Sequence, residues 1–205
     1  MTADLLLRDT LDLKKGEWLL QNAANSNVGR YVIALAKLRG YKTANVVRRA
    51  GQAAGLTALG ADVVVVDGPG LAEELVRATD GAEIGYGVDA VAGDATGRLA
   101  ECLADGGTIF TYGLMSGEPC LVQPRILFQK DLRLRGYYMG RPLRKRTPEA
   151  QRNLFTDLVS LMADGTLVAE IAGTYPLRDV RSAVRHAAKT GAERVGKVLM
   201  APNLD

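Results

Sequence analysis

The stretch WLLQNAANSNVGRYVIALAKLRG, residues 18–40, decides the fold. It begins with an apolar run over residues 18–23 that predicts a strand. Apolar residues then recur at helical spacing, at Val28, Val32, Leu35 and Ala36. Gly40 ends the predicted helix, because glycine readily adopts the left-handed conformation that closes many helices. A strand, a short loop and a helix in this order predict the first half of a βαβ unit.

The loop of this stretch covers the positions where a dinucleotide-binding domain carries the glycines of G-x-G-x-x-G. Those positions hold Ala24, Ser26 and Gly29 here, so only the glycine that serves helix packing is present. Two interpretations stay open from these residues. In one, backbone N–H groups at the helix N-terminus hold a phosphate, together with the side chains of Ser26 and Asn27. In the other, the loop is a plain junction whose helix is capped by Asn25 or Ser26.

Strand and helix patterns alternate along the chain as far as residue 147. Further strands are predicted over residues 43–49, 62–67, 86–93, 106–113 and 132–140. Helices are predicted between them over residues 55–60, 71–79, 96–103 and 124–130. The central strands are apolar on both faces, as a sheet covered by helices on both sides requires. The predicted fold class is therefore α/β, with a doubly wound, Rossmann-like parallel sheet.

The pattern changes after Pro148. A helix over 149–163, a strand over 169–177, a helix over 180–191 and a strand over 196–202 predict a small α+β tail. Such a tail is too short to bury a core of its own. It either lies against the main sheet or belongs to an incomplete second domain.

Composition excludes several classes of protein. The 26 basic and 23 acidic residues are spread along the chain and give a net charge of only +3, which argues against a nucleic-acid-binding protein. No apolar run reaches the roughly 18 residues that span a bilayer, so we expect a soluble protein. The basic run RPLRKR, Arg141 to Arg146, is interpreted as a solvated connector rather than a binding patch, because prolines bracket it.

Residues that commonly bind metals are scarce. Cys102 and Cys120 show no CxxC or CxxH spacing, and His186 is the single histidine. We therefore expect no metal site, and two isolated thiols indicate a reducing compartment.

Two arginines end the second predicted strand. In NAD-binding domains an acidic residue about 20 positions after the glycine loop accepts hydrogen bonds from the ribose hydroxyls. Arg48 and Arg49 stand there instead. Guanidinium groups bind a 2′-phosphate through charge-assisted hydrogen bonds, so the pair predicts NADPH over NADH. The alternative is that both are ordinary surface charges.

Several segments together resemble one family. The run LDLKKGEWLLQNAANSNVGRYVIALAKLRGYKTANVVRR, residues 11–49, resembles the cofactor domain of the medium-chain dehydrogenase/reductase superfamily. The resemblance is greatest to zinc-free 2-enoyl thioester reductases of the mitochondrial type, whose phosphate loop has the form N-A-x-N-S-x-V-G. It continues in TYGLMSGEP (111–119), FQKDLRLRGYYMG (128–140) and GKVLM (196–200). It favours a phosphate loop that is built differently from the glycine-rich one.

The resemblance implies roles for individual residues around NADPH. The pyrophosphate would lie on Asn25, Ser26, Asn27 and Val28, and the 2′-phosphate on Arg48 and Arg49. The nicotinamide-side ribose and carboxamide would lie beside Tyr112, Gly113, Leu114 and Met115. The nicotinamide pocket would include Tyr137, Tyr138 and Met139, with Lys197 close to the cofactor. Ordinary strand packing is the alternative for the two tyrosines, and a solvated strand end is the alternative for Lys197.

The resemblance also implies a domain organisation. Residues 1–147 would be the NADPH-binding domain with a leading interdomain helix, and residues 148–205 would complete a GroES-like catalytic domain. Family members carry that domain upstream, together with the tyrosine thought to protonate the substrate, so we expect no catalytic residue within these 205 residues. The complete protein would be an enzyme, whereas turnover by this chain alone stays open.

The expected activity is NADPH-dependent reduction of the C2–C3 double bond of an enoyl thioester, of the fatty acid synthesis type, carried on coenzyme A or acyl carrier protein. The alternatives are reduction of a quinone or another α,β-unsaturated carbonyl compound, and a non-catalytic NADPH-binding or scaffold protein.

A homodimer through strand 132–140 is expected, because an open sheet edge invites pairing and the superfamily commonly pairs these strands. We expect neither a nucleic-acid partner nor a membrane partner, and a location in the cytoplasm or the mitochondrial matrix.

Overall fold

Six parallel strands form the main sheet in the order β3-β2-β1-β4-β5-β6. Their bounds are Trp18–Gln21 (β1), Lys42–Val47 (β2), Val63–Val66 (β3), Tyr86–Asp89 (β4), Thr108–Thr111 (β5) and Arg133–Gly136 (β6). The structure, a computed structural model, describes residues 1–189 and 196–203. This strand order is that of the Rossmann fold, so the predicted fold class is confirmed.

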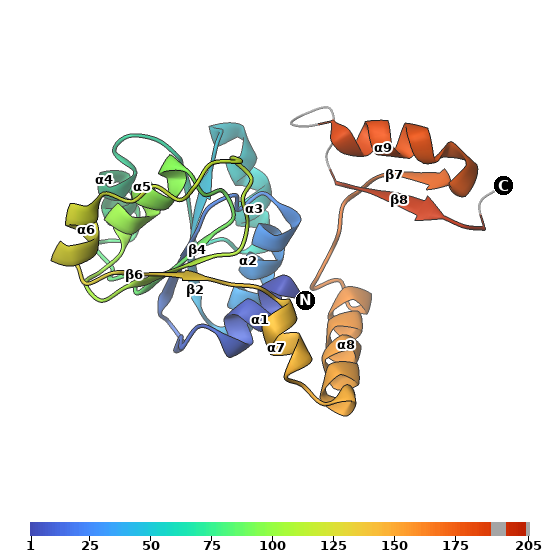
Figure 1. Cartoon of the computed structure of the whole chain (residues 1–205), viewed down its shortest axis with the longest axis horizontal. Coiled ribbons are helices and arrows are strands. Elements are labelled where there is room, and N and C mark those ends of the chain that lie inside the picture. The colour runs from blue at the N-terminus through green and yellow to red at the C-terminus, as the bar shows by residue number, and fades with distance from the viewer. Residues whose placement is uncertain (190–195, 204–205) are drawn as a thin grey trace. The chain divides into compact units, whose positions relative to one another are not determined.

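Helices connect the strands and cover both faces of the sheet (Figure 1). They are α1 (Thr2–Asp9), α2 (Asn27–Arg39), α3 (Ala53–Leu59), α4 (Leu71–Ala78), α5 (Asp94–Cys102) and α6 (Pro124–Gln129), with a 3₁₀ turn, η1, at Ala50–Gln52. Two further helices follow the sheet, α7 (Gly140–Arg144) and α8 (Pro148–Ala163). Within the residues that the structure describes, no helix is long and apolar enough to cross a membrane.

The two faces of the sheet have separate buried clusters. On one face α4 and α5 pack on alternate residues of the central strands: Leu20, Ala44, Val46, Val65 and Ile109. On the other face α2 and α3 pack through Ile33 and Leu56 against Ala24 and Val47. Alternation between two apolar faces explains why these strands read as continuous hydrophobic runs.

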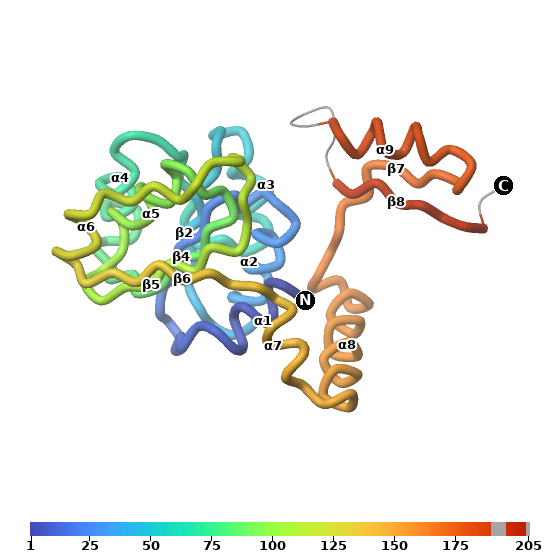
Figure 2. Tube along the Cα trace, viewed as in Figure 1, coloured from blue at the N-terminus to red at the C-terminus, as the bar shows by residue number. Residues whose placement is uncertain are grey.

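The sixth strand is shorter than the predicted 132–140. It ends at Gly136, and Gly140 begins α7, so the run RPLRKR is partly helical rather than only a connector. Pro142 is tolerated there because it lies in the first turn, where backbone N–H groups have no intrahelical acceptor. Figure 2 traces this path from β5 through β6 into α7.

The chain forms two compact units, Met1–Leu158 and Val159–Asp205. The second unit holds a parallel pair of strands, β7 (Ile171–Pro176) and β8 (Lys197–Ala201), with a 3₁₀ turn, η2 (Leu177–Asp179), and the helix α9 (Val180–Ala188). The last residues of the helix predicted over 180–191 fall outside the described residues. The boundary predicted between residues 147 and 148 divides the NADPH-binding domain from the segment that would complete a GroES-like domain, and it stays a prediction.

Candidate functional site: the crevice at the carboxyl ends of β1 and β4

The order of strands reverses between β1 and β4. From β1 the chain proceeds outward to β2 and β3 on one side, and from β4 to β5 and β6 on the other. The loops after β1 and β4 therefore diverge at the carboxyl edge of the sheet, and this is the position at which doubly wound domains form their ligand-binding crevice. Most of the predicted site residues of the first unit follow the carboxyl ends of β1, β2, β5 and β6.

A buried polar network joins the two sides of this crevice. The side-chain amide of Asn22 donates to Asp89 Oδ1 at 2.6 Å, and Asn22 Oδ1 accepts the N–H of Ala90 at 2.8 Å. Asp89, with no exposed surface, also accepts the N–H of Ala92 at 3.0 Å and the Thr96 hydroxyl at 2.6 Å. A buried carboxylate needs such donors, so the network fixes both loops.

The loop between β1 and α2 is tightly wound. Ala23 has a φ of 46°, a left-handed conformation that is uncommon for a residue with a side chain. The N–H of Ser26 donates to Ala23 O at 2.8 Å, and Ser26 Oγ accepts the N–H of Gly29 at 3.1 Å. Ser26 is thus the N-cap of α2, as the capping interpretation expected.

The capped helix still offers hydrogen-bond donors to an anion. The N–H groups of Asn27 and Val28 lie in the first turn of α2 and make no hydrogen bond within residues 1–189 and 196–203. The hydroxyl proton of Ser26 is not used by the cap, because the oxygen acts as the acceptor. Asn25 is exposed beside them. The loop therefore serves as a helix cap and also leaves free donors at the positive end of the helix dipole.

Gly29 performs the packing role expected of it. A Cβ at this position would lie 2.5 Å from Ala24 O and 2.7 Å from Ala24 Cα, closer than atoms can approach. Ala24 itself is buried in the cluster beneath α2 rather than presented at the loop surface. The glycine that the sequence retains is the one that brings α2 against the chain leaving β1.

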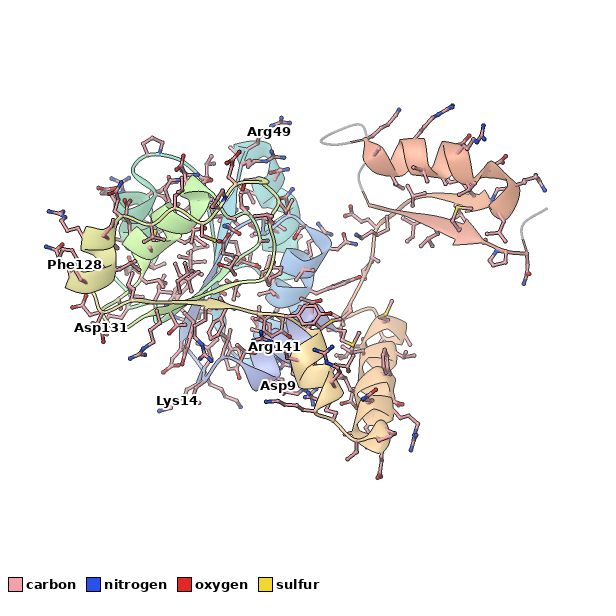
Figure 3. The ribbon with its side chains drawn as sticks, viewed as in Figure 1. Asp9, Lys14, Arg49, Phe128, Asp131 and Arg141 are labelled. Carbon is pink, nitrogen blue, oxygen red and sulfur yellow. The ribbon has the colours of Figure 1, made fainter. Side chains whose placement is uncertain are left out.

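Arg48 and Arg49 follow the end of β2 directly and are exposed. The N–H of Ala24 donates to Val46 O at 3.2 Å, which places the end of β2 beside the β1–α2 loop. Neither guanidinium forms an ion pair with the described part of the chain. Arg49 projects away from the ribbon, as Figure 3 shows. Two unpaired cations thus flank the loop.

The segment after β5 packs on the segment after β4. The N–H of Met115 donates to Ala90 O at 3.1 Å, and a Cβ on Gly113 would lie 2.6 Å from the same oxygen. Leu114 and Met115 are about two-thirds exposed, at 62% and 65%. The Tyr112 hydroxyl is buried and has no hydrogen-bond partner in the part of the chain that the structure describes. Burial raises the pKa of this tyrosine, so it remains a neutral donor.

Tyr137, Tyr138 and Met139 lie between β6 and α7. The backbone N–H of Tyr137 donates to Thr111 O at 2.8 Å, and its hydroxyl is buried without a partner among the described residues. Burial, and then the negative charge of Asp9, raises the pKa of Tyr137 to about 12. Met139 Sδ accepts a hydrogen bond from the Thr2 hydroxyl at 3.4 Å.

Lys197 belongs to the chain's second unit. It is exposed at the start of β8, and its backbone N–H donates to Glu170 O at 2.7 Å. Its proximity to the cofactor stays a prediction. No group of three or more His, Cys, Asp or Glu side chains suited to a metal ion occurs in the described residues.

The network around Asp89 was missed at the sequence level. Residues 86–93 were interpreted as one strand, although β4 ends at Asp89. An acidic residue near the end of a predicted buried strand was the available signal, because a carboxylate there has to find several donors.

The fold and the crevice define this chain as a dinucleotide-binding domain of the Rossmann class. It belongs to the zinc-binding dehydrogenase family, whose sequence model matches residues 27–156, within the medium-chain dehydrogenase/reductase superfamily. It is 33% identical over 198 residues to the human mitochondrial enoyl-[acyl-carrier-protein] reductase, with 92% of this chain and 52% of that protein covered.

Solved structures agree with this assignment. A quinone oxidoreductase of Pseudomonas syringae pv. Tomato DC3000 superposes with a TM-score of 0.79 at 27% identity, covering 98% of this chain and 61% of that one. Etr1p, a mitochondrial 2-enoyl thioester reductase of Candida tropicalis, superposes with a TM-score of 0.77 over 91% of this chain and 56% of its own. At 24% identity, the second likeness concerns the fold alone. The chain spans about half the length of the curated relatives it matches.

Proposed function

We propose that this chain is the NADPH-binding part of an enoyl thioester reductase. The observation that carries the proposal is the combination of free first-turn N–H groups on α2 with two unpaired arginines at the neighbouring end of β2. The first group suits a pyrophosphate and the second a 2′-phosphate. Etr1p, which shares the fold, was solved with NADP and crotonyl-CoA.

The residues present fit the cofactor in a further respect. A buried hydroxyl without a partner is costly unless a ligand or water satisfies it, and Tyr112, whose backbone N–H donates to Asp89 O, has a hydroxyl without a partner among the described residues. In the proposed arrangement Asn25 to Val28 hold the pyrophosphate, Arg48 and Arg49 hold the 2′-phosphate, and Tyr112 to Met115 border the nicotinamide-side ribose and carboxamide. Tyr137 to Met139 border the nicotinamide, and Lys197 is proposed to lie close to the cofactor.

When bound, NADPH supplies a hydride to C3 of the enoyl thioester, and a proton must reach C2 to complete the saturated product. The chain's own residues bind and orient the cofactor, whereas the proton donor is proposed to lie in a GroES-like domain that residues 148–205 would complete. Orientation and proton transfer each contribute orders of magnitude to rate. We therefore assign the activity to the complete, zinc-free enzyme.

The second candidate activity is reduction of a quinone, favoured by the likeness to the Pseudomonas quinone oxidoreductase. The two are separated by adding either crotonyl-CoA or a quinone to the complete enzyme and following the oxidation of NADPH. Faster turnover of the thioester supports the proposal, and turnover of the quinone alone contradicts it. Binding without turnover of either compound supports a scaffold protein.

The proposed partners are an enoyl thioester on coenzyme A or acyl carrier protein and a second copy of the chain. All four residues of β6 are exposed at the sheet edge. Pairing of two copies along this edge would join their sheets into one. The human relative is named as mitochondrial, and we propose the mitochondrial matrix or the cytoplasm as the location of this protein.

A further inference from the structure

A pocket of about 480 Å³ lies between the end of α1, the strands β5 and β6, and helix α7. It shares no lining residue with the β1–α2 loop or with Arg48 and Arg49. Its polar lining includes Asp9, Arg135, Tyr137, Arg141, Lys145 and Arg146. Asp9 and Arg141 are labelled in Figure 3, on α1 and α7.

Positive charge predominates in this pocket. Of the four cations in its lining, only Arg146 has a carboxylate partner, Asp9, at 2.8 Å. Within the described chain, Arg135, Arg141 and Lys145 form no ion pair. Three uncompensated cations thus face one recess.

Other contacts hold two of the guanidinium groups in place. Arg135 lies 5.2 Å from the centre of the Phe110 ring, which is only 3% exposed. Arg146 is held by Asp9 and by a 3.1 Å hydrogen bond to Pro142 O. Cations fixed in this way lose little side-chain freedom when an anion binds.

The remaining two cations are four residues apart. Arg141 lies in α7 and Lys145 is its C-cap, so their side chains project from the same side of the helical segment. Like charges at this spacing weaken a helix. The placement of Arg141 and Lys145 four residues apart therefore does not serve to stabilise α7.

One neutral donor completes the lining. The Tyr137 hydroxyl is buried and has no hydrogen-bond partner in the described residues. With the pKa of Tyr137 raised to about 12, this hydroxyl keeps its proton at neutral pH and can donate it. A buried donor without an acceptor indicates that a ligand or water supplies one.

We propose that this pocket binds a small polyanion that carries phosphate groups. Guanidinium groups match phosphate oxygens in pairs, and a volume of several hundred Å³ suits a small organic molecule. Arg135 projects from a face of β6, since it stacks on Phe110 of the paired strand, so strand pairing along the β6 edge uses different groups. The pocket shares Tyr137 and Tyr138 with the residues proposed to border the nicotinamide, but it is separate from the groups proposed to bind the pyrophosphate and the 2′-phosphate of NADPH.

The test is a titration of the full 205-residue chain with inorganic pyrophosphate, followed by amide NMR. Saturable shifts at residues 135–146 are expected. Arg141→Glu should weaken this binding at least ten-fold, about 1.4 kcal/mol. Arg125→Glu, the same charge reversal on an exposed residue of α6 outside the pocket, should leave it unchanged. Tyr137→Phe should weaken it less than Arg141→Glu does.

Shifts confined to residues 22–29 and 48–49 would show that pyrophosphate binds the cofactor loop alone and would overturn the proposal. If Arg125→Glu and Arg141→Glu weaken pyrophosphate binding equally, the loss follows from the net charge of the chain and not from the pocket. That result would also overturn the proposal. If Arg141→Glu disturbs α7, the milder pair Arg141→Ala and Lys145→Ala replaces it. Unchanged affinity in that folded variant would contradict the pocket.

Discussion

Asn22 and Asp89 are 67 residues apart in sequence, yet the amide of one donates to the carboxylate of the other at 2.6 Å, where the strand order reverses. This hydrogen bond joins the two loops that border the candidate cofactor crevice. Asp89 has no exposed surface, so its carboxylate relies on donors from the chain to replace water.

We expect Asp89→Ala to destabilise the chain by about 3 kcal/mol, because several buried donors lose their acceptor at once. Urea unfolding measures the change. Thr96→Val, which removes only one of those donors, should cost about 1 kcal/mol. Equal stability of Asp89→Ala and the unmodified chain would show that the network does not hold the loops.

Cofactor preference should depend on Arg48 and Arg49. Calorimetry should find NADPH bound at least ten times more tightly than NADH, a difference of about 1.4 kcal/mol. Replacing both arginines by alanine removes the groups that recognise the 2′-phosphate and should abolish the difference. Equal affinities for the two nucleotides in the unmodified chain would contradict the assignment.

Ser26 should separate helix capping from ligand binding. Ser26→Ala and Ser26→Leu both remove the hydrogen bond to Gly29, so each should cost about 1 kcal/mol of stability. Only leucine adds bulk beside the free N–H groups, so only Ser26→Leu should abolish NADPH binding. Retained binding in a folded Ser26→Leu variant would leave the loop with a capping role alone.

Pairing of two copies should depend on the outer edge of β6. The N–H groups of Arg133 and Tyr137 donate towards β5, so by alternation the N–H of Leu134 faces the open edge. Sedimentation should give a mass near twice 21.9 kDa, and Leu134→Pro should shift it towards the monomer. Leu134→Ala keeps the N–H and is the matched control. A monomeric unmodified chain would count against the dimer.

Cys102 should be protected from thiol reagents while the chain is folded. Burial raises the pKa of Cys102 from 9.0 to about 12, so little thiolate exists at pH 8. The resulting stabilisation is present below pH 9 and is lost as the pH rises towards 12. Iodoacetamide labelling at pH 8, located by peptide mass spectrometry, should reach Cys102 only after unfolding. Rapid labelling in the native state would refute this.

The order of elements in the Rossmann domain followed from local sequence. Strands covered by helices on both faces read as apolar runs, and helices repeat their apolar residues every three or four positions. Residues 18–40 alone predicted β1, the loop and α2, and Gly29 kept the packing role that its position indicated. Each of these features depends on neighbours along the chain.

The end of β6 was predicted less well. Alternating residues suggested a strand through residue 140, but α7 begins there. A proline is compatible with the first turn of a helix and also with a loop. The local sequence RPLRKR therefore could not show which of the two structures forms. Contacts such as the ion pair of Arg146 with Asp9, 137 residues away, favour the observed path.

The sequence by itself determined the parallel Rossmann sheet, the capped helix α2 and the placement of two arginines after β2. Only the tertiary structure decided that Asn22 meets Asp89, and that Arg135, Arg141 and Lys145 line one pocket with Tyr137. The physical reason is that periodicity and helix capping depend on residues close together in the sequence. Hydrogen bonds to a buried carboxylate, and the grouping of cations in one pocket, depend instead on which strand ends the sheet brings together.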